Sequence, residues 1–131
     1  MKKGFIYASI GATIFVTACN KKIYQDNGES IYKTGRNIEG KTMLDKSASR
    51  IKMVNSCKTC HGKNGDAMKR ASIKFSDLSN NKYFSVPYND TLFFRFLDHD
   101  LRSDGTKADI GVIWKMSNKD KIDLLRYLKS L

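Results

Sequence analysis

The 131-residue sequence predicts a single all-α domain that follows an N-terminal export segment. Residues 90–97 and 118–131 place apolar side chains at helical spacings of one, three and four, whereas strand-like alternation is scarce. The chain is long enough for one domain and short for two. Its 11% of aromatic residues is too high for a disordered chain, despite a formal net charge of +11.

The first 18 residues differ in composition from the rest of the chain and predict a signal peptide. Lys2 and Lys3 form a basic start, and residues 4–18 are an apolar run too short to cross about 30 Å of hydrocarbon as an ordinary helix. Residues 16–19 read VTAC, which resembles the lipobox of bacterial lipoproteins. The resemblance implies cleavage before Cys19 and acylation of its sulfur. An uncleaved signal anchor with an incidental cysteine is the alternative.

Residues 19–28 are polar and rich in Lys, Asn, Asp and Gln. This composition suits a tether between a lipid on Cys19 and a folded domain over residues 29–131, although a terminus without a role has the same composition. We therefore expect an exported protein, lipid-anchored on the periplasmic side of a bacterial membrane.

One motif predicts the chemistry. Residues 57–62 read CKTCHG, and C-x-x-C-H is the attachment signature of a c-type haem. In a helical turn, Cys57 and Cys60 share a face and can reach the two vinyl groups of the porphyrin, while His61 supplies a nitrogen ligand to iron. The motif occurs once, so the sequence predicts one covalently bound haem c with its iron.

Three other interpretations of the motif account for fewer of its residues. A thioredoxin-like dithiol needs a preceding strand within a βαβ pattern. A structural zinc site needs four ligands, and the mature domain adds only His99 to the two cysteines and His61. A disulfide between Cys57 and Cys60 leaves His61 without a role.

From residue 29 onwards the chain resembles the class I cytochromes c, more narrowly the small exported mono-haem domains of bacteria. The resemblance rests on CKTCHG with Gly65 after it, on GESIY at residues 28–32, and on the sequence from Trp114 to the end. The last two are similar to the family's first helix and to its final loop and helix. The resemblance implies the cytochrome c fold, with helices wrapped around one haem, and transfer of single electrons rather than an enzymatic reaction.

Two helices are predicted from caps and apolar spacing. Asn89 is an N-cap for residues 90–97, whose Leu and Phe side chains would form a wall of the haem pocket. Ser117 is an N-cap for the last helix. In that helix the predicted buried stripe is Ile122, Leu124, Leu125, Leu128 and Leu131, and the predicted solvent side is Lys119, Asp120, Asp123, Arg126 and Lys129.

Long loops are predicted on both sides of the motif. The first contains Met43 and Met53, which we interpret as packing or surface residues rather than iron ligands. The second, residues 71–87, lacks periodicity, and we expect it to cover the haem with Phe75 and Leu78 turned inwards.

The sixth iron ligand is where the resemblance weakens. The family supplies a Met from the loop before the last helix, but residues 109–114 contain none. Met116 is the nearest candidate, although it directly precedes Ser117, where an apolar residue often acts as a hydrophobic staple. His99 is the second candidate, and an open or water-bound position is the third.

The family's Pro after the motif is also absent, because Pro87 is the chain's one proline. In the family, the carbonyl of that residue orients the proximal imidazole. Another carbonyl must therefore accept the Nδ1 proton of His61 if the tautomer of this ring is fixed.

The sixth ligand separates two functions. A six-coordinate haem would act as an electron carrier, whereas a five-coordinate haem could bind a small gas or peroxide in a sensor or catalytic subunit. No acid–base pair beyond His99 supports peroxide chemistry, so the sequence favours the carrier.

The basic charge predicts the kind of partner. Cleavage after residue 18 would remove two lysines and no acids, and so lower the formal charge from +11 to +9. We expect acidic redox partners, attracted by electrostatic steering. The sequence contains no recognition helix or aromatic platform for nucleic acid.

Overall fold

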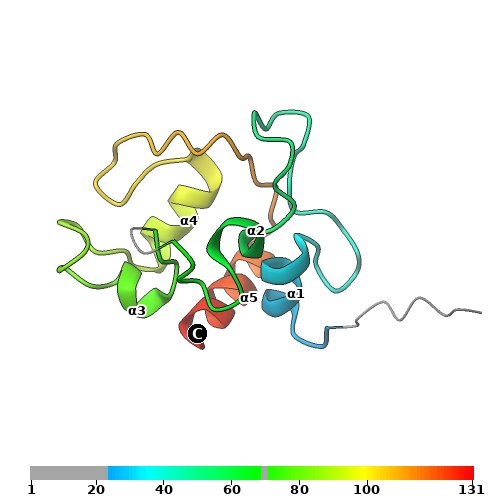
Figure 1. Ribbon diagram of the computed structural model, residues 1–131, viewed down its shortest axis with the longest axis horizontal. Coiled ribbons are helices and arrows are strands. Elements are labelled where there is room, and N and C mark those ends of the chain that lie inside the picture. Colours follow the sequence, from blue (N-terminus) through cyan, green and yellow to red (C-terminus); the bar gives the residue numbers. More distant parts are fainter. Residues whose placement is uncertain (1–23, 69–70) are drawn as a thin grey trace, which may run out of the picture.

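The computed structural model describes residues 24–68 and 71–131, so the predicted signal peptide and Cys19 lie outside the described residues. All regular elements in this part of the chain are helices, which confirms the all-α class; strand-like pairing is limited there to isolated bridges. No helix in it is both long and apolar enough to span a membrane. The helices are α1 (Asn27–Thr34), α2 (Cys57–His61), α3 (Phe75–Leu78), α4 (Asp90–His99) and α5 (Asn118–Lys129) (Figure 1).

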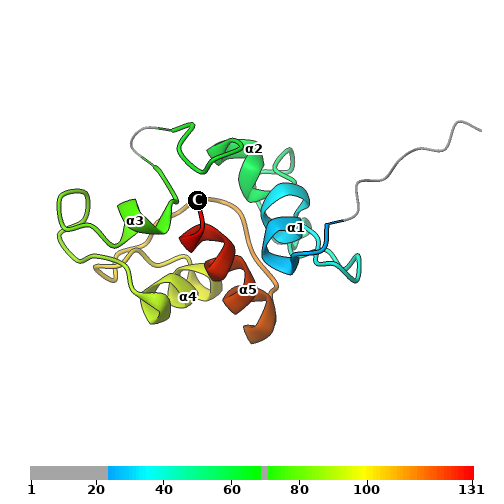
Figure 2. The same ribbon diagram turned by 90° about the horizontal axis from the view of Figure 1, so that it is seen from below.

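Helices α1 and α5 lie side by side, although they come from opposite ends of the described chain (Figures 1 and 2). Gly28 allows this contact, because a Cβ there would lie 2.0 Å from the carbonyl oxygen of Asp123 and 2.9 Å from Cβ of Tyr127. Asn27 and Gly28, which the sequence had assigned to the end of the tether, are therefore buried parts of α1. The folded domain begins before residue 29.

The same contact buries polar groups and corrects part of the prediction for α5. Asp120 and Asp123, expected on the solvent side, are only 6% and 8% exposed, whereas Ile122, expected in the buried stripe, is 48% exposed. The physical reason is that Asn27 lies between the two carboxylates. Its Nδ2 donates to Asp120 at 3.1 Å and to Asp123 at 2.9 Å. Ser117 also donates to Asp120 at 2.6 Å, so burial leaves neither carboxylate unpaired.

The caps predicted for the two long helices are confirmed. Asn89 accepts a hydrogen bond from the backbone of Leu92, and Ser117 accepts one from Asp120, so both helices begin where the sequence predicts. Helix α4 continues two residues beyond the predicted end at Leu97.

One apolar cluster joins all five helices of the described chain. Cys57 of the C-x-x-C-H motif belongs to this cluster. We call it the core cluster, and it consists of Ile31, Tyr32, Met43, Cys57, Leu78, Tyr88, Phe93, Leu97, Leu124, Leu125 and Leu128.

The long segments before α2 and before α5 pair with each other. Lys115 N–H donates to the Met43 carbonyl at 2.7 Å, and Asp45 N–H donates to the Ile113 carbonyl at 2.9 Å. Met43 is fully buried and Met53 is 87% exposed, in agreement with packing and surface roles.

The loop expected over residues 71–87 contains the short helix α3. Leu78 of α3 is buried, and Phe75 packs half-buried against the core cluster, so both side chains turn inwards as predicted.

Because α1 and α5 approach closely at Gly28, a methyl group added at this position should strongly destabilise the fold. Gly28→Ala should lower the free energy of unfolding by about 3 kcal/mol or more, because the atom it meets belongs to the backbone of α5. Gly40→Ala is the control, since a Cβ at Gly40 meets nothing within 4 Å and only the φ of +85° opposes it. Denaturant unfolding measures both, and equal losses would contradict the contact.

The buried carboxylates predict a pH-dependent role for Asn27. Burial alone would raise the pKa of Asp120 and Asp123, but hydrogen bonds from Ser117, Asn27 and Lys119 outweigh it and lower each pKa. A depressed folded-state pKa gives stability that is present above the unfolded value of about 4 and is lost as the pH falls through the folded value. The cost of Asn27→Ala in denaturant unfolding should therefore be larger at pH 7 than at pH 3. An equal cost at both pH values would contradict this account.

Candidate functional site

Residues Cys57–His61 of the CKTCHG motif form α2, the helical turn that the interpretation as a haem site requires. Ser56 precedes the helix in an extended conformation, and its N–H donates to the Thr59 hydroxyl at 3.3 Å. Gly62 ends the helix with a φ of +72°, a conformation that favours glycine, and donates its N–H to the Lys58 carbonyl at 2.9 Å. The motif therefore terminates its own helix directly after His61.

The two cysteines of α2 have different surroundings. Both are free thiols, so the structure does not contain the disulfide considered from the sequence. Cys57 is buried in the core cluster, and burial raises the pKa of its thiol to about 12; Cys60 is exposed. The site therefore presents one sulfur to the protein interior and one to the surface.

The ring of His61 is oriented by a backbone carbonyl. Its Nδ1 lies 2.8 Å from the oxygen of Ala71, and a carbonyl can only accept, so Nδ1 carries the proton and the Nε2 lone pair is free. Ala71 thus supplies the acceptor that the missing proline left unassigned. Burial lowers the pKa of His61, and the opposing contribution of the Ala71 bond is smaller, so the ring is neutral at pH 7, as a metal ligand must be.

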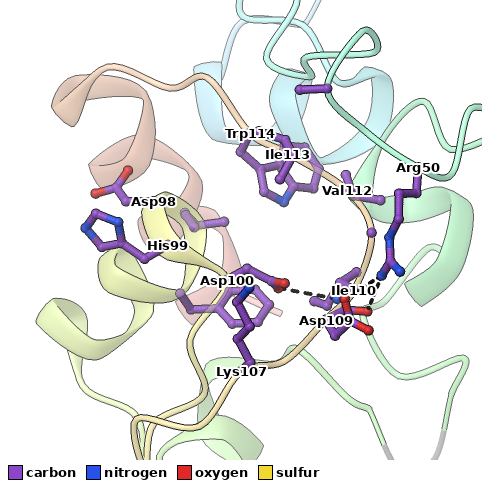
Figure 3. Close-up of a pocket in the computed structure, with 14 residues that line it drawn as sticks. Arg50, Asp98, His99, Asp100, Lys107, Asp109, Ile110, Val112, Ile113 and Trp114 are labelled. Atoms are coloured by element: carbon purple, nitrogen blue, oxygen red, sulfur yellow. Dashed lines mark hydrogen bonds and ion pairs between the residues drawn. The ribbon is translucent and has the colours of Figure 1, made fainter.

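The two candidates for a sixth ligand have different environments. Met116 is half-buried and packs against the core cluster that includes Cys57. His99 is exposed at the end of α4, with its ring directed away from residues 110–112 (Figure 3). Met116 therefore packs on the core cluster that includes Cys57, whereas His99 is exposed and lines the cavity described next.

A cavity of about 340 Å³ lies between the end of α4, residues 107–114 and the segment around Arg50 (Figure 3). Its lining contains no Met and no Cys. Phe96, Leu97 and Trp114 form part of its apolar wall, and each belongs to or packs against the core cluster. The cavity is therefore bounded by the same apolar interior as Cys57.

Charged side chains lie at the rim of this cavity. Arg50 pairs with Asp109 at 2.5 Å, and the Arg50 N–H donates to the Gly111 carbonyl at 2.8 Å. Asp109 has a φ of +55° and Gly111 a φ of +79°, so two residues with left-handed backbone shape this wall. The sequence does not predict this cavity, because the cavity depends on a contact between residues 59 positions apart.

Over residues 24–68 and 71–131, no group of three or more His, Cys, Asp or Glu side chains could hold a metal ion. The four-ligand zinc site considered from the sequence is therefore not present in this part of the chain. No family model matches the chain, and no curated protein or solved structure matches it either. A functional assignment thus rests on the residues and their geometry.

Proposed function

We propose that this chain is a c-type haem domain that transfers single electrons. The observation that carries the proposal is the ring of His61, directly after C-x-x-C, with Nδ1 bonded to the Ala71 carbonyl and Nε2 free. Neutral imidazole in this tautomer is a good iron ligand, and metal-binding histidines commonly have such a carbonyl on the other nitrogen. When bound, haem c supplies a reversible one-electron couple between ferric and ferrous iron.

The environments of the motif residues fit this group. Cys57 and Cys60 would form the thioethers, His61 would be the axial ligand, and the core cluster would supply apolar enclosure. Because Cys57 is buried and Cys60 is exposed, a group attached to both sulfurs would be enclosed at one side and accessible at the other. This arrangement suits electron exchange with a partner protein.

The N-terminal sequence and the charge supply the cellular context of the proposal. The VTAC sequence at residues 16–19 supports lipidation of Cys19 and anchoring on the periplasmic side of a bacterial membrane. A charge of +9, which remains when the two lysines of residues 1–18 are removed from +11, supports acidic redox partners rather than nucleic acid.

The cavity favours a second candidate function. A five-coordinate haem could bind a small gas or peroxide, and the residues that line the cavity include part of the segment where the family carries its Met. That segment provides apolar walls and no sulfur. One experiment separates the two functions: an absorption spectrum of the reduced protein with and without carbon monoxide. An unchanged spectrum supports the carrier, and rapid binding supports the second candidate.

Covalent attachment predicts the behaviour of the cysteine variants. Cys57→Ala or Cys60→Ala should leave at most one thioether, and the double variant none, so acidic organic solvent should extract its haem. Ser56→Ala is the control, because it keeps both sulfurs. Loss of haem should also unfold much of the domain, since bound ligands stabilise the native state, and circular dichroism would report this loss. Haem that stays covalently bound in the double variant would disprove the proposal.

Met116 is our first candidate for the sixth ligand, and Met116→Ala tests it. The variant should bind carbon monoxide and have a lower reduction potential, because a thioether stabilises ferrous iron. The wild-type ferric protein should show the weak near-infrared sulfur-to-iron band. If Met116 only packs, the variant should lose about 1 to 3 kcal/mol of stability and keep its spectrum. His99→Ala is the parallel variant, and a spectral change there alone would make His99 the ligand.

A further inference from the structure

Helix α1 holds the turn that follows His61. Tyr32 is fully buried in α1, and its hydroxyl donates to the carbonyl of Gly62 at 2.7 Å. Burial, with a smaller contribution from Cys57, raises the pKa of Tyr32 far above its ordinary value, so the hydroxyl keeps its proton and can donate. Helices α1 and α2 also lie next to each other in both views (Figures 1 and 2). Tyr32 thus connects the first helix to the residue directly after the motif histidine.

The turn at Gly62 begins the loop that contains Ala71, whose carbonyl orients the imidazole of His61. Gly62 redirects the chain with its φ of +72°, and a Cβ there would lie 2.7 Å from that of Ala67. The N–H of Ala67 then donates to the His61 carbonyl at 3.1 Å. Further along, the Ala71 carbonyl lies 2.8 Å from Nδ1 of His61. The loop that carries this acceptor therefore begins at the turn to which Tyr32 donates.

Two contacts close the same loop at its base. Ile73 N–H donates to the Gly65 carbonyl at 2.8 Å, and Lys74 pairs with Asp66 at 2.6 Å. The ion pair is partly exposed and is therefore weak. The Tyr32 bond is part-buried and comes from a fully buried side chain, so its loss would remove a donor that water can replace only in part.

We propose that Tyr32 is a positioning residue of the haem site, which fixes the imidazole of His61 by holding the Gly62 carbonyl. This inference rests on the proposed function. A fixed Nδ1–H to carbonyl bond makes the other ring nitrogen more basic. A more basic ligand stabilises ferric iron, so Tyr32 keeps the reduction potential lower than an unconstrained imidazole would give.

Tyr32→Phe tests the proposal, because it removes the hydroxyl and keeps the ring that packs 5.3 Å from the Tyr127 ring. We expect the Nδ1 proton of His61 to exchange with solvent about fivefold faster in NMR spectra, the fold-change that corresponds to one hydrogen bond of about 1 kcal/mol. Voltammetry should show a higher reduction potential than for the wild-type protein.

Tyr127→Phe is the matched control. It removes a hydroxyl from the other ring of the pair and leaves the Gly62 bond intact, so the exchange rate and the potential should both stay at wild-type values. A Tyr32→Phe protein that loses stability but keeps the wild-type exchange rate and potential would overturn the inference and make Tyr32 a packing residue. A wild-type protein purified without haem would refute the proposed function instead. The exchange rate of the Nδ1 proton would still test Tyr32 in that protein.

Discussion

The close contact between α1 and α5 is the constraint on which the rest of the fold depends. Gly28 brings the two backbones together, and a methyl group at this position would meet the Asp123 carbonyl at 2.0 Å. One turn later on α1, Tyr32 packs on Tyr127 and reaches the Gly62 carbonyl. Because one short helix makes both contacts, the position of α5 and the position of the His61 turn are coupled. A change in the packing of α1 against α5 should therefore also change the position of the turn after His61.

Local signals in the sequence predict where α4 and α5 begin, but not the short helix α3 or the way α5 faces its neighbour. Ser117 and Asn89 predict the helix starts correctly, because a cap acts within a single turn. Charge patterning placed Asp120 and Asp123 in solvent, and that was wrong. Their burial depends on Asn27, more than 90 residues away, whose amide donates to both carboxylates. A polar partner at such a distance leaves no periodic signal in either helix.

The candidate site likewise has parts that the sequence predicts and parts that depend on long-range contacts. The motif suits a helical turn at residues 57–61, and the missing proline led us to expect another carbonyl on Nδ1 of His61 if its tautomer is fixed. The sequence could not identify Ala71 as this acceptor, because its carbonyl comes from a residue ten positions along the chain, beyond the turn at Gly62. The cavity was missed for the same reason, since it depends on residues near Arg50 meeting residues near Gly111. Long-range backbone contacts carry no residue signature in a single sequence.

Met116 links the fold to the choice between the two candidate functions. It directly precedes the Ser117 cap, so the start of α5 fixes its backbone while its side chain packs on the core cluster. A half-buried side chain that already packs on an apolar cluster loses less conformational entropy on becoming a ligand than a fully exposed one. The cavity wall from Ile110 to Trp114 offers no competing sulfur, so a side-chain sulfur ligand would have to come from the far end of this segment. The α2 turn and the positive net charge are compatible with both candidate functions, so the choice between them depends on whether the Met116 thioether binds the iron.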